Sequence, residues 1–165
     1  MENNTILAID PGYDRCGVAL ITNRTLTQSW CIQTSKQDTH PKRLAHIYET
    51  LRSLIEEYHP THIALETLFF SVNKTSAIKV AEARGVVVTL AGLYEIELVE
   101  LSPQAVKQSM TGVGNASKEQ VQKMTALTLK LDIKGKLDDE IDAIALGIAA
   151  SETIRVIALA NKKSI

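Results

Sequence analysis

Residues 5–12, TILAIDPG, decide the fold, because an apolar stretch that suits a buried strand ends in Asp10 and turns at once through Pro-Gly. A second apolar stretch at 16–21 and an alternating stretch at 26–32 suit two further strands. Turn-forming residues separate these two stretches. We therefore expect an antiparallel meander of three strands at the start of the chain.

Helices and strands alternate after the meander. Apolar residues recur at helical spacing over 41–58, and His59-Pro60 ends that helix. The same criteria predict a strand at 62–66, a helix at 75–93, a strand at 96–101, a brief helix opening at Ser102, a helix opened by a Ser117–Gln120 capping box, and a last helix at 138–161. This order favours an α/β fold with a mixed five-stranded sheet flanked by helices.

The chain has 165 residues, enough for one domain with a sizeable core, and no linker, repeat or low-complexity stretch divides it. We therefore expect a single domain over 1–165. One segment, 86–91, is apolar on nearly all sides. That pattern predicts burial, either in the core or against a second subunit.

Four carboxylates lie at the ends of predicted elements. Asp10 and Glu66 each close an apolar strand, and Asp139 and Asp142 share one side of the last helix at its start. Such acids cost free energy on burial unless a cation pairs with them. Two metal ions about 4 Å apart can support phosphoryl transfer, and Mg²⁺ prefers oxygen ligands. The pattern therefore indicates a metal-dependent phosphodiesterase.

Each acid also has a local interpretation to weigh. Acids are common in the first turn of a helix, where the helix dipole favours them, and Asp10 before a proline could serve a turn. Glu66 has no such local role, because it closes an apolar strand. We expect Asp138 and Glu140 to point away from the other acids and to be ordinary first-turn residues.

The formal net charge is −1, which by itself suits a nucleic-acid partner poorly. The four acids contribute −4, so the rest of the chain carries +3. Residues 103–136 hold six lysines against Glu119 and Asp132, a local net charge of +4. From charge alone, a solvated lysine face is the favoured interpretation of this stretch.

The N-terminus does not have the pattern of a signal peptide, and no apolar run reaches the length of about 18 residues that a membrane span needs. We therefore expect a cytoplasmic protein with no membrane partner. Cys16 and Cys31 lack the spacing of metal ligands. In that compartment they are expected to be reduced thiols.

Six stretches resemble, in the same order, the RuvC family of Holliday-junction resolvases. They are spread over roughly the first 150 residues: 6–12, 64–70, 76–79 with 83–86, 104–108 with 111–114, 118–122 and 138–145. The first holds an Asp-Pro-Gly turn, which ribonuclease H-like folds share with actin-like ATPases. The ATPases are built from two such halves, for which this chain is too short. The last stretch resembles the Asp-x-x-Asp-Ala helix of the family.

The resemblance implies a ribonuclease H-like fold and a homodimeric endonuclease that nicks two opposing strands of a four-way DNA junction, leaving 5′-phosphates. It implies that the four carboxylates are catalytic ligands of two Mg²⁺ ions, with Mn²⁺ able to substitute. Lys107 and Lys118 match basic positions beside the active site, which implies a catalytic role and a contact to the scissile phosphate. A branch-migration motor is a candidate further partner.

The resemblance also implies a DNA-binding surface around the active site. Phe69 follows the strand that ends at Glu66 and could stack on bases near the crossover. Further candidate contacts to DNA are Asn73, Lys74, Lys79, Arg84, Lys107 and Lys118. Burial in the core is the favoured alternative for Phe70, and a plain surface lysine is the alternative for Lys79.

Residues 13–16, YDRC, depart from the family pattern, and Asp14 adds a negative charge near the site. Two other functions stay open. One is a ribonuclease H-like hydrolase of the YqgF type acting on RNA, which the stretch 107–118 and the last helix fit less well. The other is a non-catalytic junction-binding protein, against which the complete set of acids argues.

Overall fold

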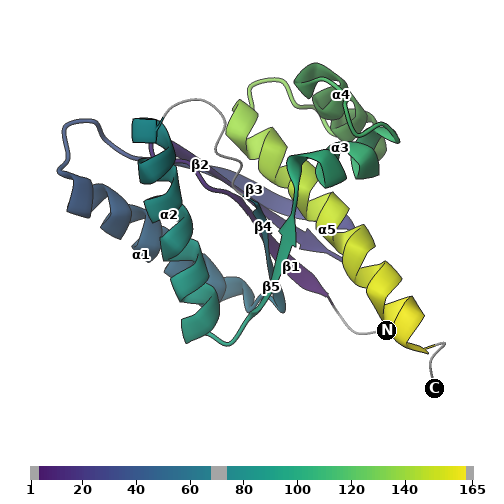
Figure 1. Ribbon diagram of the computed structural model, residues 1–165, viewed down its shortest axis with the longest axis horizontal. Helices are drawn as coiled ribbons and strands as arrows, with labels where there is room; N and C mark the ends of the chain where they lie inside the picture. The colour runs from purple at the N-terminus through teal and green to yellow at the C-terminus, as the bar shows by residue number, and fades with distance from the viewer. Residues whose placement is uncertain (1–3, 68–73, 163–165) are drawn as a thin grey trace.

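The computed structural model describes residues 4–67 and 74–162, without the side chains of 74–76 and 162 (Figure 1). Each start or end of a helix or strand that the sequence predicted lies within one residue of the observed one. The strands are β1 (Thr5–Asp10), β2 (Arg15–Thr22), β3 (Thr25–Gln33), β4 (His62–Glu66) and β5 (Glu97–Leu101). The helices are α1 (His40–Tyr58), α2 (Lys74–Leu93), α3 (Pro103–Thr111), α4 (Lys118–Leu129) and α5 (Asp138–Lys162).

The strands form one mixed sheet in the order β3-β2-β1-β4-β5. The meander of β1, β2 and β3 is antiparallel, as predicted, whereas β4 runs parallel to both β1 and β5. Parallel neighbours need a crossover connection, and here α1 and α2 lie in those connections. The predicted mixed five-stranded sheet is therefore confirmed.

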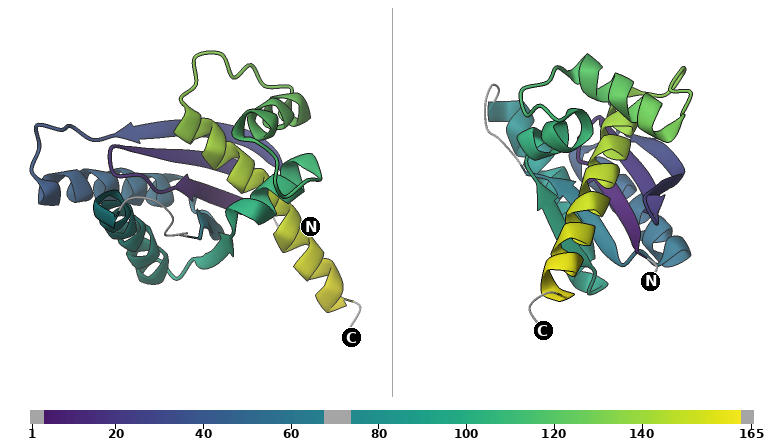
Figure 2. Two further views of the ribbon diagram at one scale, coloured as in Figure 1. Left: turned by 45° about the horizontal axis from the view of Figure 1, so that its top comes forward. Right: turned by 90° about the vertical axis from the view of Figure 1, so that its right-hand side faces the viewer.

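Helices cover both faces of this sheet, with α1 and α2 on one face and α5 on the other (Figure 2). In β1, Leu7 and Ile9 pack on the α1–α2 side, while Ile6 and Ala8 pack on the α5 side. All four side chains are at most 1% exposed. The period-two alternation of the strand therefore decides which face receives the next side chain, Asp10.

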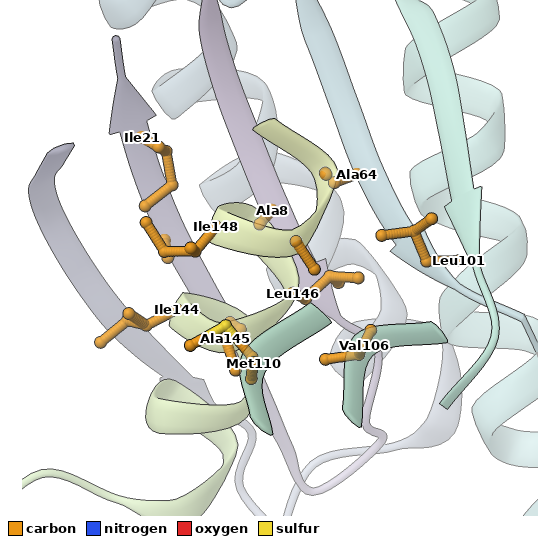
Figure 3. Packing of buried hydrophobic residues seen from close by; sticks show 14 of the residues in the cluster. Ala8, Ile21, Ala64, Leu101, Val106, Met110, Ile144, Ala145, Leu146 and Ile148 are labelled. Atoms are coloured by element: carbon orange, nitrogen blue, oxygen red, sulfur yellow. The ribbon is translucent and has the colours of Figure 1, made fainter. Parts of the chain in front are cut away.

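Helix α5 packs close to the sheet because small residues lie between them. A Cβ atom at Gly147 would lie 2.6 Å from Ile21 Cγ1 and 3.0 Å from Ala8 Cβ. Figure 3 shows Ala8 and Ala64, from neighbouring strands, beside the part of α5 that carries Ile148. This close packing fixes the position of the helix and therefore of the acids in its first turn.

By length and composition alone, α5 is apolar enough over Asp138–Asn161 to cross a membrane. Half of its most apolar 18-residue window is buried inside the protein, and most of 143–150 belongs to the core on the α5 side of the sheet. Packing against the sheet therefore accounts for the apolar character of the helix in this structure.

Helix α2 is buried in the core along one side only, so burial of its other side against a second subunit stays a prediction. Val87 and Leu90 are fully buried against the sheet side. Ile78, Val88 and Leu93 lie on the opposite side and are 61%, 38% and 64% exposed. These three residues form what we call the exposed apolar face of α2.

Candidate active site

Asp10 and Glu66 lie at the ends of neighbouring strands, on the same face of the sheet. β1 and β4 are parallel with Ile9 opposite Leu65, so the next residue of each strand reaches the same edge. Ile9 and Leu65 belong to the core on the α1–α2 side, and alternation directs the two acids to the other side. Both acids therefore face the start of α5.

The start of α5 brings Asp139 and Asp142 to this edge, and Gly17 makes the approach possible. Gly17 lies opposite Asp10 in the pairing of β1 with β2. A Cβ atom at Gly17 would lie 1.8 Å from the backbone oxygen of Asp139 and 2.4 Å from its carbonyl carbon. A residue without a side chain is therefore required for the first turn of α5 to rest on β2.

Burial and repulsion between acids raise the pKa values of Asp10, Glu66 and Asp142. Burial is the largest cause at Asp10, repulsion by the other three acids follows, and together they raise its pKa from 3.8 to about 7. Burial and the charge of Asp142 also raise the pKa of Glu66. Burial raises the pKa of Asp142 despite a hydrogen bond from Lys118. Acids from β1, β4 and α5 therefore form one electrostatic site.

Two lysines predicted from the sequence lie at this cluster. Lys118 Nζ, at the start of α4, is 2.8 Å from Asp142 Oδ2 and 3.7 Å from Asp138 Oδ2. Asp138 is therefore closer to the site than we predicted. The charges of Lys107 in α3 and of Lys118 both lower the pKa of Glu66, against the larger effect of burial. Helices α3 and α4 thus bring two cations beside the acids.

The oxygen atoms of the cluster suit a hard divalent cation. Asp139 Oδ2 is buried and 2.8 Å from Arg15 Nε, yet it accepts no hydrogen bond from any described residue. A buried carboxylate oxygen without a donor is costly unless a cation binds it. Within residues 4–67 and 74–162, no three Asp, Glu, His or Cys side chains are close enough to surround one ion. Binding an ion would therefore require the acids to converge further.

A buried arginine secures the turn that follows β1. Arg43 is 7% exposed and donates to Thr34 Oγ1 at 2.8 Å and to Tyr13 O at 3.2 Å. Its guanidinium lies 3.8 Å from the centre of the Tyr13 ring and pairs with Asp14. This role of Arg43 was not predicted from the sequence, although Arg43 precedes Ile47 by four residues on the apolar stripe of α1. An arginine on such a stripe indicates a buried partner.

Three of the predicted DNA contacts fall outside the part of the chain that the structure describes. They are Phe69, Asn73 and the side chain of Lys74, and the core position favoured for Phe70 is outside it as well. The roles predicted for these residues therefore stay predictions from the sequence.

Lys79 and Arg84, both in α2, differ in whether an acidic side chain is shown paired with them. Lys79 is exposed, and its Nζ lies 5.2 Å from the centre of the Tyr13 ring, near the turn after β1. Arg84 forms an ion pair with Glu100 of β5. The charge of Arg84 is thus partnered within the protein, which favours a structural role, whereas Lys79 stays available at the surface.

Residues 6–150 match the family described as "Crossover junction endodeoxyribonuclease RuvC". The protein of that name from Brachyspira hyodysenteriae is 41% identical over 154 residues, which cover 91% of this chain and 95% of that protein. The one from Petrotoga mobilis is 43% identical over 144 residues, covering 85% and 88%.

Solved structures agree with this match. The RuvC structure from Thermus thermophilus has a TM-score of 0.82 at 25% identity, covering 92% of this chain and 96% of that one. A second structure, described as T. thermophilus RuvC in complex with Holliday junction substrate, has a TM-score of 0.83 at 24% identity and covers 93% and 96%. The ribonuclease H-like fold class predicted from the sequence is confirmed.

Proposed function

We propose that this chain, which belongs to the RuvC family of crossover junction endodeoxyribonucleases, resolves four-way DNA junctions by paired, symmetric nicks that leave 5′-phosphates. The observation that carries this proposal is the convergence of acids from β1, β4 and α5 at one edge of the sheet. A solved relative that is described as bound to a Holliday junction supports the choice of substrate.

In this proposal the four acids, Asp10, Glu66, Asp139 and Asp142, bind two Mg²⁺ ions, and Mn²⁺ is able to substitute. Such ions, when bound, supply a Lewis acid for the phosphoryl oxygens and an activated water. The buried Asp139 oxygen without a donor and the raised pKa of Asp10 support a cation at this point. Neutralising the neighbouring charges would favour the ionised form of Asp10, the form that a hard cation binds.

Lys107 and Lys118 then hold the scissile phosphate and stabilise the negative charge that develops on it. Both are close enough to the acids to lower the pKa of Glu66, which supports a position beside the reacting phosphate. Lys79 extends the cationic surface along α2. Phe69, Asn73 and Lys74 stay candidate contacts to the DNA beyond the cleavage point, and Arg84 is assigned to the fold because Glu100 holds it.

The active protein is a homodimer in this proposal, because two symmetric nicks require two active sites related by a two-fold axis. The exposed apolar face of α2 supports this assembly, since Ile78, Val88 and Leu93 expose apolar surface that a second copy would cover. Val88→Glu should therefore give the mass of a monomer in solution at a concentration where the wild type is a dimer. A monomeric wild type would contradict this part of the proposal.

We place the protein in the cytoplasm, where a DNA-repair enzyme of this family would meet its substrate and where a branch-migration motor is a candidate partner. Cys16 and Cys31 are both free, which suits a reducing compartment.

Cleavage of a synthetic four-way junction in Mg²⁺ tests the proposal, with a linear duplex, a splayed arm and an RNA–DNA hybrid as matched substrates. Paired nicks at symmetric positions near the crossover, with little cutting of the other three substrates, are expected. Preferred cutting of the hybrid would instead assign the chain to RNA hydrolysis. Tight junction binding without cleavage in Mg²⁺ or Mn²⁺ would make it a binding protein.

A further inference from the structure

Arg15 has no assigned role, although it contacts one of the candidate metal ligands. Its Nε lies 2.8 Å from Asp139 Oδ2, and the two side chains are 45% and 25% exposed. The contact lacks the geometry of a hydrogen bond, because Asp139 Oδ2 is without a donor. The pair is therefore an electrostatic contact on a half-exposed arginine, which can turn away without breaking a hydrogen bond between the two groups.

An open polar groove begins beside this pair. Arg15 and Asp139 line it together with Thr34 and Lys36, where β2 begins and β3 ends. Lys36 is exposed. Asp14, which also lines the groove, is neutralised by Arg43. Two cations, Arg15 and Lys36, are thus left in the lining of a groove that reaches the acid cluster at Asp139.

A divalent cation and the Arg15 guanidinium compete for the same carboxylate. Without a metal, the positive charge of Arg15 offsets repulsion between Asp139 and the neighbouring acids. With a metal on Asp139, the charge of Arg15 is repelled at close range. Arg15 already lines the groove, so the released guanidinium has polar surface open to it there. Its planar fork suits the paired oxygens of a backbone phosphate.

We propose that Arg15 is a cation with two positions: it holds Asp139 while the metal is absent, and on metal binding it moves into the groove and binds a phosphate of the DNA strand that leaves the active site. This inference rests on the proposed function for the identity of the ligand in the groove. It makes DNA affinity through Arg15 conditional on the metal.

The first test measures Mn²⁺ binding to the DNA-free protein by calorimetry, for wild type, Arg15→Gln and Arg24→Gln. Arg24 is the matched control, because it follows the end of β2 that is remote from Arg15 and pairs with Glu152 in the second half of α5. Coupled sites commonly change each other's affinity by about tenfold, so Arg15→Gln should bind Mn²⁺ about tenfold more tightly. Arg24→Gln should match wild type. Unchanged or weaker Mn²⁺ binding by Arg15→Gln would overturn the proposal.

The second test measures junction binding by fluorescence anisotropy in EDTA and in Ca²⁺, with gels to verify that the junction stays intact. In Ca²⁺, Arg15→Gln should bind more weakly than wild type, and its dependence on salt should fall by about one phosphate contact. In EDTA, the two proteins should bind alike. Equal weakening in both conditions would show an ordinary phosphate contact and overturn the two-position mechanism.

The two tests separate failure of this inference from failure of the proposed function. If the wild type binds and cuts junctions but Arg15→Gln behaves like wild type in both tests, only the role of Arg15 is wrong. If the wild type binds no junction in either condition, the proposed function is wrong, and the DNA-free Mn²⁺ measurement still decides whether Arg15 competes with a metal. Circular dichroism and the Tm of each variant verify that it is folded.

Discussion

Two neighbouring carboxylates in the first turn of α5 have opposite surroundings. Burial would raise the pKa of Glu140, but hydrogen bonds from Lys136 Nζ at 2.5 Å and Ser29 Oγ at 2.6 Å lower it. Asp139, one residue earlier, has a buried oxygen that accepts no hydrogen bond from a described residue. It also lies beside Asp10, whose pKa is raised to about 7. The fold satisfies one acid and leaves its neighbour without a donor.

This difference separates acids that serve the structure from acids that serve the chemistry. A stable fold pairs each charge that it buries, and Glu140 follows that rule. The cluster around Asp10 departs from it, because three of its acids raise the pKa of Asp10 even though Lys118 pairs with Asp142 and Arg15 with Asp139. Such arrangements reduce stability and persist where function requires them. Comparing variants of Glu140 with variants of the clustered acids therefore tests which acids serve the structure and which serve the chemistry.

The largest expected effect is on cleavage. Glu66→Gln keeps the shape of the side chain but removes a charged metal ligand, so cleavage of a four-way junction should fall by about a thousandfold or more. Glu140→Gln is the matched control and should cut within about threefold of wild type, because Glu140 faces Ser29 and not the site. Equal losses in both variants, measured as single-turnover rates, would contradict the comparison.

The next largest effect is on stability and concerns Gly17, which allows α5 to pack against β2. Gly17→Ala should lower the free energy of unfolding by about 3 kcal/mol or more, because the new Cβ would overlap the backbone of Asp139. Gly85→Ala is the control, since a Cβ there meets no atom within 4 Å, and alanine in a helix should stabilise by up to about 1 kcal/mol. Urea unfolding at one protein concentration measures both changes. Equal stability of the two variants would contradict the proposed close approach.

A smaller effect should appear in the pH dependence of stability in EDTA. The folded-state pKa of Asp10 is raised from 3.8 to about 7, so its charge destabilises the fold at pH 7 and above, and this penalty disappears as the pH falls toward 4. Asp10→Asn removes the penalty. The variant should be about 2 kcal/mol more stable than wild type near pH 8 and similar to it near pH 4.

Glu140→Gln should show the opposite sign in the same measurement. The pKa of Glu140 is lowered in the folded state, so its stabilisation is present above its unfolded pKa and is lost as the pH falls through the folded value. The variant should therefore be less stable than wild type near neutral pH, with the difference shrinking in acid. Parallel pH profiles for the Asp10 and Glu140 variants would mean that the two acids do not differ.

The smallest effect concerns the metal alone. Mg²⁺ in excess should raise the Tm of the wild type by a few degrees, because a ligand that binds only the folded state stabilises it. The Tm of Asp10→Asn should respond less, and that of Glu140→Gln should respond as the wild type does. A response to Mg²⁺ that Asp10→Asn leaves unchanged would remove Asp10 from the metal site.

The fold was predictable from the sequence because its local patterns agree with one another. Alternation in the first strands, helical spacing over 41–58 and the Ser117–Gln120 capping box each gave an element that the structure contains. Alternation also implies that Asp10 and Glu66 lie on the α5 face of the sheet, since each directly follows a residue that packs on the α1–α2 face. The sequence left open whether the apolar segment in α2 packs in the core or against a second subunit, because hydropathy does not distinguish the two.

The surroundings of the site were less predictable, because they depend on contacts between residues that are distant in sequence. Arg15 and Asp139 are more than a hundred residues apart, and Arg43 reaches the turn after β1 from another helix. The ion pair between Arg84 and Glu100 likewise forms only when α2 meets β5. Residue type marks such side chains as charged, but only the packed structure shows which partner each one has.

The central claim is that the four acids clustered at the edge of the sheet make this protein cut four-way DNA junctions, and one measurement tests it most directly. Wild type, Asp10→Asn and Glu140→Gln are each incubated with a synthetic junction in Mg²⁺, and both nicking and binding are measured. We predict paired symmetric nicks from the wild type and from Glu140→Gln, and binding without nicks from Asp10→Asn. Nicking by Asp10→Asn at the wild-type rate, or no nicking by the wild type, would contradict the claim.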